Sequence, residues 1–188
     1  MVTLKAQGKS GSSTFTRWGH TECGGDAKVV YAGYMASSFV NHTGGGSNYL
    51  CLTPEPKYGK LNKDIQKISL LTGVEYQLGE SNTFHDAPCV VCIIPRSSVI
   101  MIPGTNQCED GWNLEYGGYL AAQAFFEKRT EFICLDEYPQ NREGGGRDLG
   151  SGHLYRVEIR LGALPQPPFL RGYELTCAVC SFESSDRN

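Results

Sequence analysis

The chain has 188 residues, of which 40% are hydrophobic and 20% charged, a composition that is ordinary for a soluble globular protein of one moderate or two small domains. Its formal net charge of −3 gives no basic surface of the kind that nucleic acid requires, so we expect no nucleic-acid partner. The longest apolar stretch, Cys89 to Met101, is interrupted by Pro95 and Arg96 and falls short of the ~20 residues of a membrane span.

The first residues are polar and carry no apolar segment of the kind found in a secretory signal peptide. Residues 1–13 are therefore expected to form a flexible lead-in, and the charged residues 183–188 a flexible tail. On this ground the protein is either cytosolic or a mature chain from which a signal has been removed. The number and distribution of the cysteines distinguish these two possibilities.

The body of the chain is an internal repeat. Four pairs of identical residues lie 85 positions apart: Cys23 and Cys108, Tyr31 and Tyr116, Gly33 and Gly118, Tyr34 and Tyr119. The match continues through Cys51 and Cys134 to the motifs CVVC at residues 89–92 and CAVC at residues 177–180, with small changes of offset that indicate loop insertions. It divides the chain into a first repeat, residues 14–95, and a second repeat, residues 96–182.

Strand signals dominate both repeats. Val90 to Ile94, Val99 to Ile102 and Ala178 to Phe182 are short β-rich runs, and apolar residues alternate with charged ones from Tyr155 to Leu161. Leu120 to Arg129 contains helix formers, although its counterpart in the first repeat does not, and it predicts either a strand or a short helix. The glycine clusters at residues 44–46 and 144–146 predict turns. The fold class is therefore mainly β.

All eight cysteines belong to the repeat, four in each copy, which favours a disulfide framework and an oxidising compartment. We prefer pairings in which Cys23 and Cys51 each join one member of the first motif; the framework residues are Cys23, Cys51, Cys89, Cys92, Cys108, Cys134, Cys177 and Cys180. The sequence leaves the choice within each motif open. A zinc site on the two CxxC motifs and thioredoxin-like redox chemistry are the disfavoured alternatives, because the motifs lie far apart and inside β-type runs.

No sequence motif of a standard active site is present, so we expect no cofactor and no bound metal, and a non-enzymatic function is favoured. The weak candidates for ligand binding are Arg17, Trp18, His42, Asn48 and Tyr49, which combine aromatic faces with polar groups. Asn41 begins a sequon that would accept a glycan in an exported protein. A secreted enzyme using His20, His42 or His85 with a metal is a third-ranked alternative.

Several segments together resemble a known family. They are Thr16-Arg17-Trp18-Gly19 before Cys23, residues 44–52 (GGGSNYLCL), Pro88 followed by CVVC, Met101-Ile102-Pro103-Gly104, Gly111-Trp112, and Glu174-Leu175-Thr176 followed by CAVC. The chain is similar, over about residues 14–180, to the non-collagenous C-terminal region of sponge short-chain (spongin-type) collagens and to related secreted invertebrate proteins. The resemblance implies an extracellular, disulfide-bonded module, which in collagens also helps chains to associate. Because no Gly-X-Y tract is present, a triple helix is not expected.

These observations predict two tandem cysteine-stapled subdomains with pseudo-twofold symmetry, packed as one unit. The leading functional hypothesis is a secreted, non-enzymatic module that recognises carbohydrate or a matrix polymer in a lectin-like way. The alternative is a collagen-type end domain that drives assembly of matrix proteins, as a trimer for example.

Overall fold

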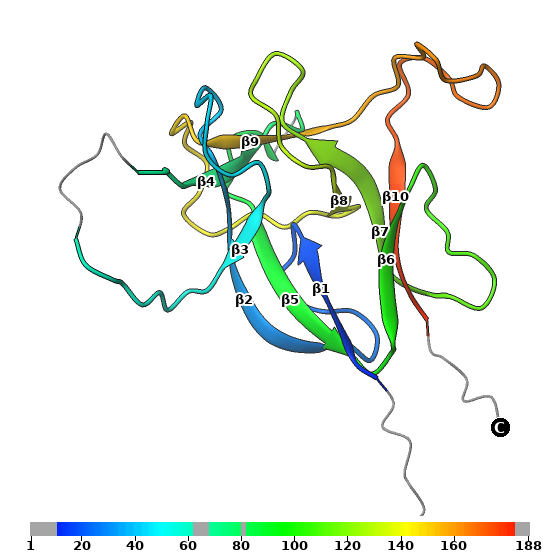
Figure 1. The fold of residues 1–188 in the computed structure, drawn as a ribbon, viewed down its shortest axis with the longest axis horizontal. Helices are drawn as coiled ribbons and strands as arrows, with labels where there is room; N and C mark the ends of the chain where they lie inside the picture. Colours follow the sequence, from blue (N-terminus) through cyan, green and yellow to red (C-terminus); the bar gives the residue numbers. More distant parts are fainter. Residues whose placement is uncertain (1–10, 62–67, 80–81, 183–188) are drawn as a thin grey trace, which may run out of the picture.

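The computed structural model describes residues 11–61, 68–79 and 82–182, and these residues form ten β-strands and no α-helix (Figure 1). The strands are β1 (Ser13–Trp18), β2 (Lys28–Ser37), β3 (Leu50–Leu52), β4 (Thr72–Tyr76), β5 (Pro88–Ile94), β6 (Ser98–Pro103), β7 (Asn113–Ala122), β8 (Ile133–Asp136), β9 (Gly152–Arg156) and β10 (Thr176–Phe182). The expectation of a mainly β fold is confirmed. The expected tail, and all but the last three residues of the lead-in, lie outside the described residues. Within the described ranges no helix has the length and hydropathy to cross a bilayer.

Seven of the strands close into a barrel in the order β7-β8-β1-β5-β2-β4-β9, with β9 pairing back to β7. The other three strands extend the sheet beyond the ring. β10 pairs with β7 and carries β6 on its far side, while β3 pairs with β2 (Figure 1). The ring holds both halves of the chain in one sheet.

The antiparallel pairings of the first repeat recur in the second. β5 lies between β1 and β2 as β10 lies between β6 and β7, and β2 also pairs with β3 and β4 as β7 does with β8 and β9. Two parallel pairings, β1 with β8 and β4 with β9, join the halves. Among the described strands β6 has no corresponding pairing with β3, so the halves differ here. The pseudo-twofold axis stays a prediction.

The cysteines form four disulfides, and no free thiol is present. The bonds are Cys23–Cys92, Cys51–Cys89, Cys108–Cys180 and Cys134–Cys177, so each repeat has the preferred type of pairing in the same order. Each CxxC motif lies within a strand, β5 or β10, where residues three apart point to opposite faces of the sheet. The two cysteines of a motif therefore bind partners on opposite sides, which excludes both the zinc and the thioredoxin-like alternatives.

The hydrophobic core has two clusters, and each draws residues from both repeats. One contains Met35 and Tyr76 beside Leu154; the other contains Ile94 beside Val179. Since neither repeat has a core of its own, burial of apolar surface depends on both being present. The residues of the two repeats pack as one unit.

The repeated tyrosines and glycines perform the same local task in each half. The Tyr31 hydroxyl donates a hydrogen bond to the Cys51 carbonyl over 2.9 Å, and the Tyr116 hydroxyl donates to the Cys134 carbonyl over 2.9 Å. A Cβ atom added to Gly118 would lie 1.8 Å from the Leu135 carbonyl oxygen, and Gly33 has the equivalent close approach. These positions are repeated because each half packs its short strand, β3 or β8, closely against a long one.

The ambiguous segment Leu120 to Arg129 is a strand only at its start. β7 ends at Ala122, and the chain then turns and returns to β8 without forming a helix. Ten residues separate Ala122 from the start of β8 at Ile133, and tertiary pairing of the two strands overrides the weak helix propensity of this segment. The alternating segment from Tyr155 to Leu161 is likewise shorter as a strand, since β9 ends at Arg156.

Candidate functional site

Two of the predicted ligand-binding residues, Arg17 and Trp18, pack within the fold. The Arg17 guanidinium donates through Nε to Asp136 Oδ2 over 2.7 Å and through Nη1 to the Glu22 carbonyl over 3.1 Å. This ion pair is largely buried, with the Arg17 and Asp136 side chains 17% and 4% exposed. Trp18 packs against the core, with its ring centroid 6.4 Å from that of Tyr49. Both residues connect β1 to the second repeat.

Tyr49 lies inside the protein and is only 3% exposed. Its hydroxyl donates to the His153 carbonyl over 3.0 Å and accepts from Thr130 Oγ1 over 3.1 Å, while its backbone N–H donates to Glu131 Oε1 over 2.8 Å. Burial raises the pKa of the phenol well above its usual value. The ring therefore has no face that is free to stack on a sugar.

His42, Asn48 and the sequon residue Asn41 lie on the loop that follows β2. Asn41 and Asn48 are exposed, and the His42 ring packs on Phe39 with centroids 5.1 Å apart. His42 lines a hollow of about 400 Å³ together with residues 44–46 and Lys128, but Asn48 does not line it. The structure thus brings Trp18 to Tyr49 and leaves His42 in a separate surface hollow, so the five predicted residues do not form one site.

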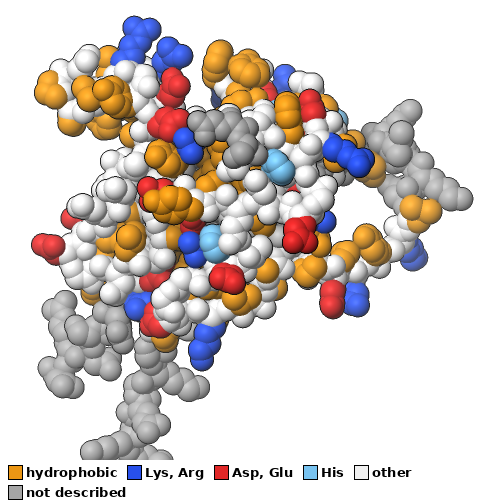
Figure 2. Space-filling view, turned by 180° about the vertical axis from the view of Figure 1, so that it is seen from behind, with side chains coloured by type: hydrophobic (Ala, Val, Ile, Leu, Met, Phe, Trp, Pro, Cys, Tyr) orange, Lys and Arg blue, Asp and Glu red, His pale blue; other side chains and the backbone are white. Residues whose placement is uncertain are grey.

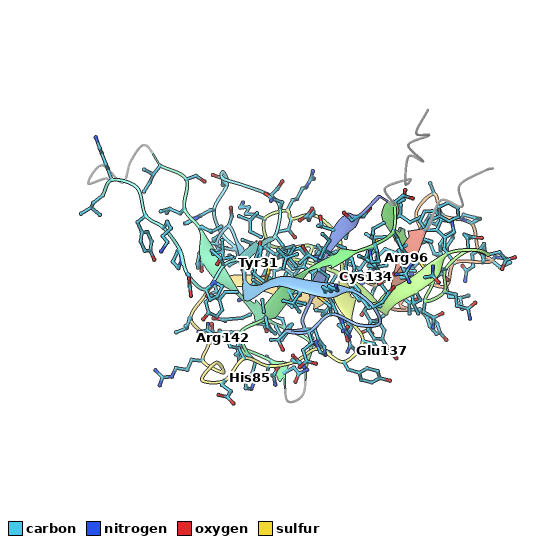
Figure 3. All side chains as sticks on the ribbon, turned by 90° about the horizontal axis from the view of Figure 1, so that it is seen from below. Tyr31, His85, Arg96, Cys134, Glu137 and Arg142 are labelled. Atoms are coloured by element: carbon cyan, nitrogen blue, oxygen red, sulfur yellow. A yellow bond between two sulfur atoms is a disulfide. The ribbon has the colours of Figure 1, made fainter. Side chains whose placement is uncertain are left out.

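The histidines of the third-ranked alternative lie in unrelated surroundings. His20 Nδ1 accepts a hydrogen bond from the Glu22 N–H over 3.1 Å, and burial followed by the charge of Arg17 lowers its pKa. His85 lies on the same side of the molecule as Arg142 (Figure 3), and a Cβ atom added to Gly146 would lie 3.1 Å from Cε1 of its ring. Among the described residues neither these histidines nor His42 belongs to a group of three side chains that could share a metal ion.

A cavity of about 900 Å³ lies between the loop that joins β7 to β8 and the end of β9. We call it the aromatic groove, after the side chains of Phe125, Phe126, Phe132 and Tyr155 that line it. The three phenylalanines are 95%, 70% and 60% exposed, and Phe126 contacts both Phe125 and Tyr155 edge-on. So much exposed aromatic surface in one cavity is typical of a binding site.

Three arginines, Arg129, Arg156 and Arg160, line the aromatic groove together with two acidic residues, Glu127 and Glu158. Arg156 is held in place by an ion pair with Glu174 over 3.3 Å and by stacking on Tyr119 at 4.3 Å, whereas Arg129 and Arg160 are exposed and form no ion pair within the described part of the chain. The Tyr155 hydroxyl donates to Glu127 Oε1 over 3.4 Å, and burial together with the Glu127 charge raises the Tyr155 pKa to about 12. The groove thus offers aromatic faces between guanidinium donors.

None of the residues predicted from the sequence to bind a ligand lines this groove. The adjacent Phe125 and Phe126, followed by Lys128 and Arg129, were the available signal, because the corresponding positions of the first repeat carry no such pair. Phe125 and Phe126 fall in the segment that predicts a strand or a short helix, and apolar residues in such an element are expected to be buried. Tyr155 and Arg160 come from a different segment, which only the closure of the barrel brings alongside.

No model of a known protein family matches the chain. The similarity to spongin-type collagens therefore stays a prediction that rests on the motifs given above. The fold and the covalent framework define a disulfide-rich β-barrel protein, and four disulfides in 188 residues are typical of the extracellular space.

Proposed function

We propose that the protein is an extracellular, non-enzymatic binding module whose aromatic groove holds a carbohydrate chain of the matrix. One observation carries the proposal: three phenylalanines, each at least 60% exposed, line a single cavity bordered by arginines. Exposing such residues is unfavourable in water, so their clustering points to a partner that covers them. The proposed lectin-like site therefore lies at the β7–β8 loop and not at Trp18 and Tyr49, which pack inside.

Binding in the groove would combine two interactions. The apolar C–H face of a sugar ring would stack on Phe125 or Phe126, which keeps most of the sugar hydroxyls in contact with water. Arg129 and Arg160 would then donate hydrogen bonds to carboxylate or sulfate groups of the chain, since a guanidinium matches such groups with two donors. An anionic polysaccharide therefore fits the groove better than a neutral one.

A binding assay with matched variants tests this proposal. Immobilised sulfated, uronate-containing and neutral polysaccharides are presented to the disulfide-bonded protein, to the double variant F125A/F126A, and to Y58A. Tyr58 is 89% exposed but lies outside the groove, so its replacement controls for loss of a surface aromatic residue. We expect anionic chains to bind, with affinity at least tenfold lower in F125A/F126A and unchanged in Y58A. Absence of binding to every polysaccharide, or equal losses in both variants, would contradict the proposal.

Assembly of matrix proteins is a second candidate, favoured by the open edge of the sheet at β6. Among the described strands β6 pairs only with β10, and Ile100 and Met101 on it are 42% and 36% exposed. Near this edge, the segment between β9 and β10 projects as a lobe that carries hydrophobic and basic side chains (Figures 1 and 2). An unpaired edge can add a strand from another chain.

Sedimentation equilibrium over a wide concentration range distinguishes this second candidate. A trimer that dissociates in I100K but persists in L149K, a lysine at another exposed apolar position, would support assembly through β6. A monomer at every concentration would remove assembly of this chain as a function.

A further inference from the structure

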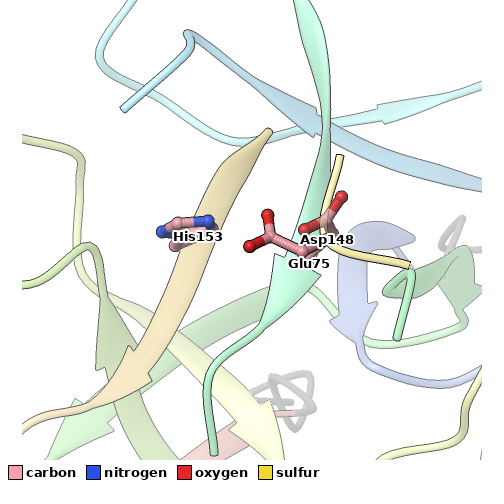
Figure 4. Close-up of side chains that lie close together, drawn as sticks. All are labelled: Glu75, Asp148 and His153. Atoms are coloured by element: carbon pink, nitrogen blue, oxygen red, sulfur yellow. The ribbon is translucent and has the colours of Figure 1, made fainter. Parts of the chain in front are cut away.

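A carboxylate-histidine cluster lies at the β4–β9 pairing, and none of its three members is among the residues that the sequence singled out for binding. β4 and β9 are parallel neighbours, and their register places Glu75 directly opposite His153. Directly opposite residues on adjacent strands project from the same face of a sheet. Asp148, on the loop before β9, brings a second carboxylate to the same place, as Figure 4 shows. The potential ligand atoms of the three side chains all lie within 4.8 Å of one another.

Glu75 is the buried carboxylate of this cluster, and one of its oxygens has no hydrogen-bond partner. It is 1% exposed; its Oε1 accepts a hydrogen bond from the Leu149 N–H over 3.1 Å, and its Oε2 is buried without a hydrogen-bond partner. A buried carboxylate oxygen with no partner is costly, by about 1–3 kcal/mol or more, because it has lost its hydration. A cation bound at Oε2 would offset this cost.

His153 is oriented as metal-binding histidines are. Its Nδ1 lies 2.7 Å from Glu127 Oε1, whose side chain is 7% exposed, and this contact favours the tautomer with the proton on Nδ1. The other ring nitrogen, Nε2, is buried and has no hydrogen-bond partner, which leaves its lone pair available. A carboxylate behind a histidine in this way fixes the ring and strengthens its donation to a metal.

We propose that Glu75, Asp148 and His153 bind one divalent transition-metal cation, with Zn²⁺ as the best match. Two carboxylates and a neutral imidazole offset a double positive charge, and the imidazole disfavours Ca²⁺ and Mg²⁺, which prefer oxygen ligands alone. Ligands ~2.1 Å from a tetrahedral zinc ion lie roughly 3.4 Å apart, a separation that small rotations of these side chains reach. Asp148 is exposed, so the ion enters from solvent on its side and keeps at least one position for water.

The ion would link the two repeats. Glu75 comes from the first repeat and the other two ligands from the second, at the β4–β9 pairing that closes the ring. Glu127, which contacts His153, also accepts the hydrogen bond of Tyr155 in the aromatic groove. Metal binding therefore stabilises the closed barrel and the loop that carries the groove, and it does so whether or not the groove binds carbohydrate.

Metal stoichiometry and affinity test the site directly. Tag-free, disulfide-bonded protein is stripped with a chelator and dialysed against Zn²⁺, Mn²⁺ or Ca²⁺; bound metal is then measured by mass spectrometry of the elements, and affinity by calorimetry. We expect one Zn²⁺ per chain, weaker Mn²⁺ binding, and a higher melting temperature in the Zn²⁺ form. Folded wild-type protein that retains no metal, or that prefers Ca²⁺, overturns the proposal.

Four variants locate the binding. E75Q and D148N each remove a ligand charge and should lower Zn²⁺ affinity at least tenfold, and E127Q, which acts through His153, should lower it about 10-fold to 100-fold. E137Q, at an exposed position in Figure 3, is the control and should bind as wild type does. Because Asp148 is exposed, D148N decides the question if E75Q fails to fold. Wild-type affinity in folded E75Q or in D148N overturns the assignment.

Discussion

β3 and β8 occupy corresponding places in the two repeats, yet their surroundings differ. Both carry a cysteine followed by leucine, pair with the long strand of their own half and accept the hydroxyl of a tyrosine. All four residues of β8 are buried, whereas Leu50 and Leu52 of β3 are 39% and 37% exposed. The same local arrangement is thus interior in one half and surface in the other.

The difference comes from contacts between the halves. β1 pairs with β8 on its outer side, and Arg17 of β1 binds Asp136 at the end of β8. β3 has no such partner among the described strands, because β6, the counterpart of β1, does not pair with it, and the positions corresponding to Arg17 and Asp136 are Ile102 and Thr53. The two halves share the disulfide, the tyrosine and the glycine, and long-range pairing sets which short strand is buried.

The largest effect should come from removing corresponding disulfides. Cys51–Cys89 and Cys134–Cys177 close loops with sequence separations of 38 and 43, for which chain entropy alone gives about 4 kcal/mol each. Cys134 and Cys177 both lie in the core, whereas Cys51 is partly exposed. Guanidinium unfolding should therefore show a loss for C134A/C177A that exceeds the loss for C51A/C89A by about 1 kcal/mol. Equal losses of unfolding free energy in the two double variants would mean that the burial of β8 adds nothing to the stability that the Cys134–Cys177 disulfide contributes.

Next in size is the ion pair that exists in only one half. R17M leaves the buried Asp136 without its cation and should lower the free energy of unfolding by about 3 kcal/mol. I102M places the same residue at the corresponding position of β6 and should change it by less than about 1.5 kcal/mol. Thermal and denaturant unfolding measure both. Unchanged stability in R17M together with lost ligand binding would return Arg17 to the list of binding residues.

The close-packed glycines allow a finer comparison. A methyl group at Gly118 or Gly33 would lie within 2 Å of the carbonyl oxygen of Leu135 or Leu52, at 1.8 and 1.9 Å. β3 can move outward into solvent, but β8 is fixed between β7 and β1. G118A should therefore cost about 2–3 kcal/mol and G33A about 1 kcal/mol or less, as measured by equilibrium unfolding. A larger loss in G33A would show that β3 is the more rigidly held strand.

The smallest losses of stability are expected for the tyrosine hydroxyls. Y116F leaves the buried Cys134 carbonyl without its donor and should cost about 1–3 kcal/mol. Y31F should cost about 0.5–1 kcal/mol, because water can reach the Cys51 carbonyl at the partly exposed β3. Amide hydrogen exchange of β8 and β3 would locate each loss. The comparison fails if the two variants lose stability equally.

The aromatic residues show that burial or exposure of such a side chain does not follow from the sequence alone. The aromatic faces of Trp18 and Tyr49 suggest ligand binding, but Tyr49 is part of the core and Trp18 packs against it. Phe125 and Phe126 looked like residues of a buried element and are instead exposed on a loop. Aromatic side chains suit both environments, so residue type alone cannot assign them.

Local alternation and cysteine positions that recur at a nearly constant spacing are enough to predict the strand-rich fold, the internal repeat and the disulfide framework. Long-range pairing, which no local pattern encodes, sets which repeat has its short strand buried, where the aromatic groove forms, and that Glu75 lies opposite His153. Residues 78 positions apart become neighbours there through the register of one parallel pairing. No local pattern encodes that register, since it follows from closing the barrel around a core that both repeats share.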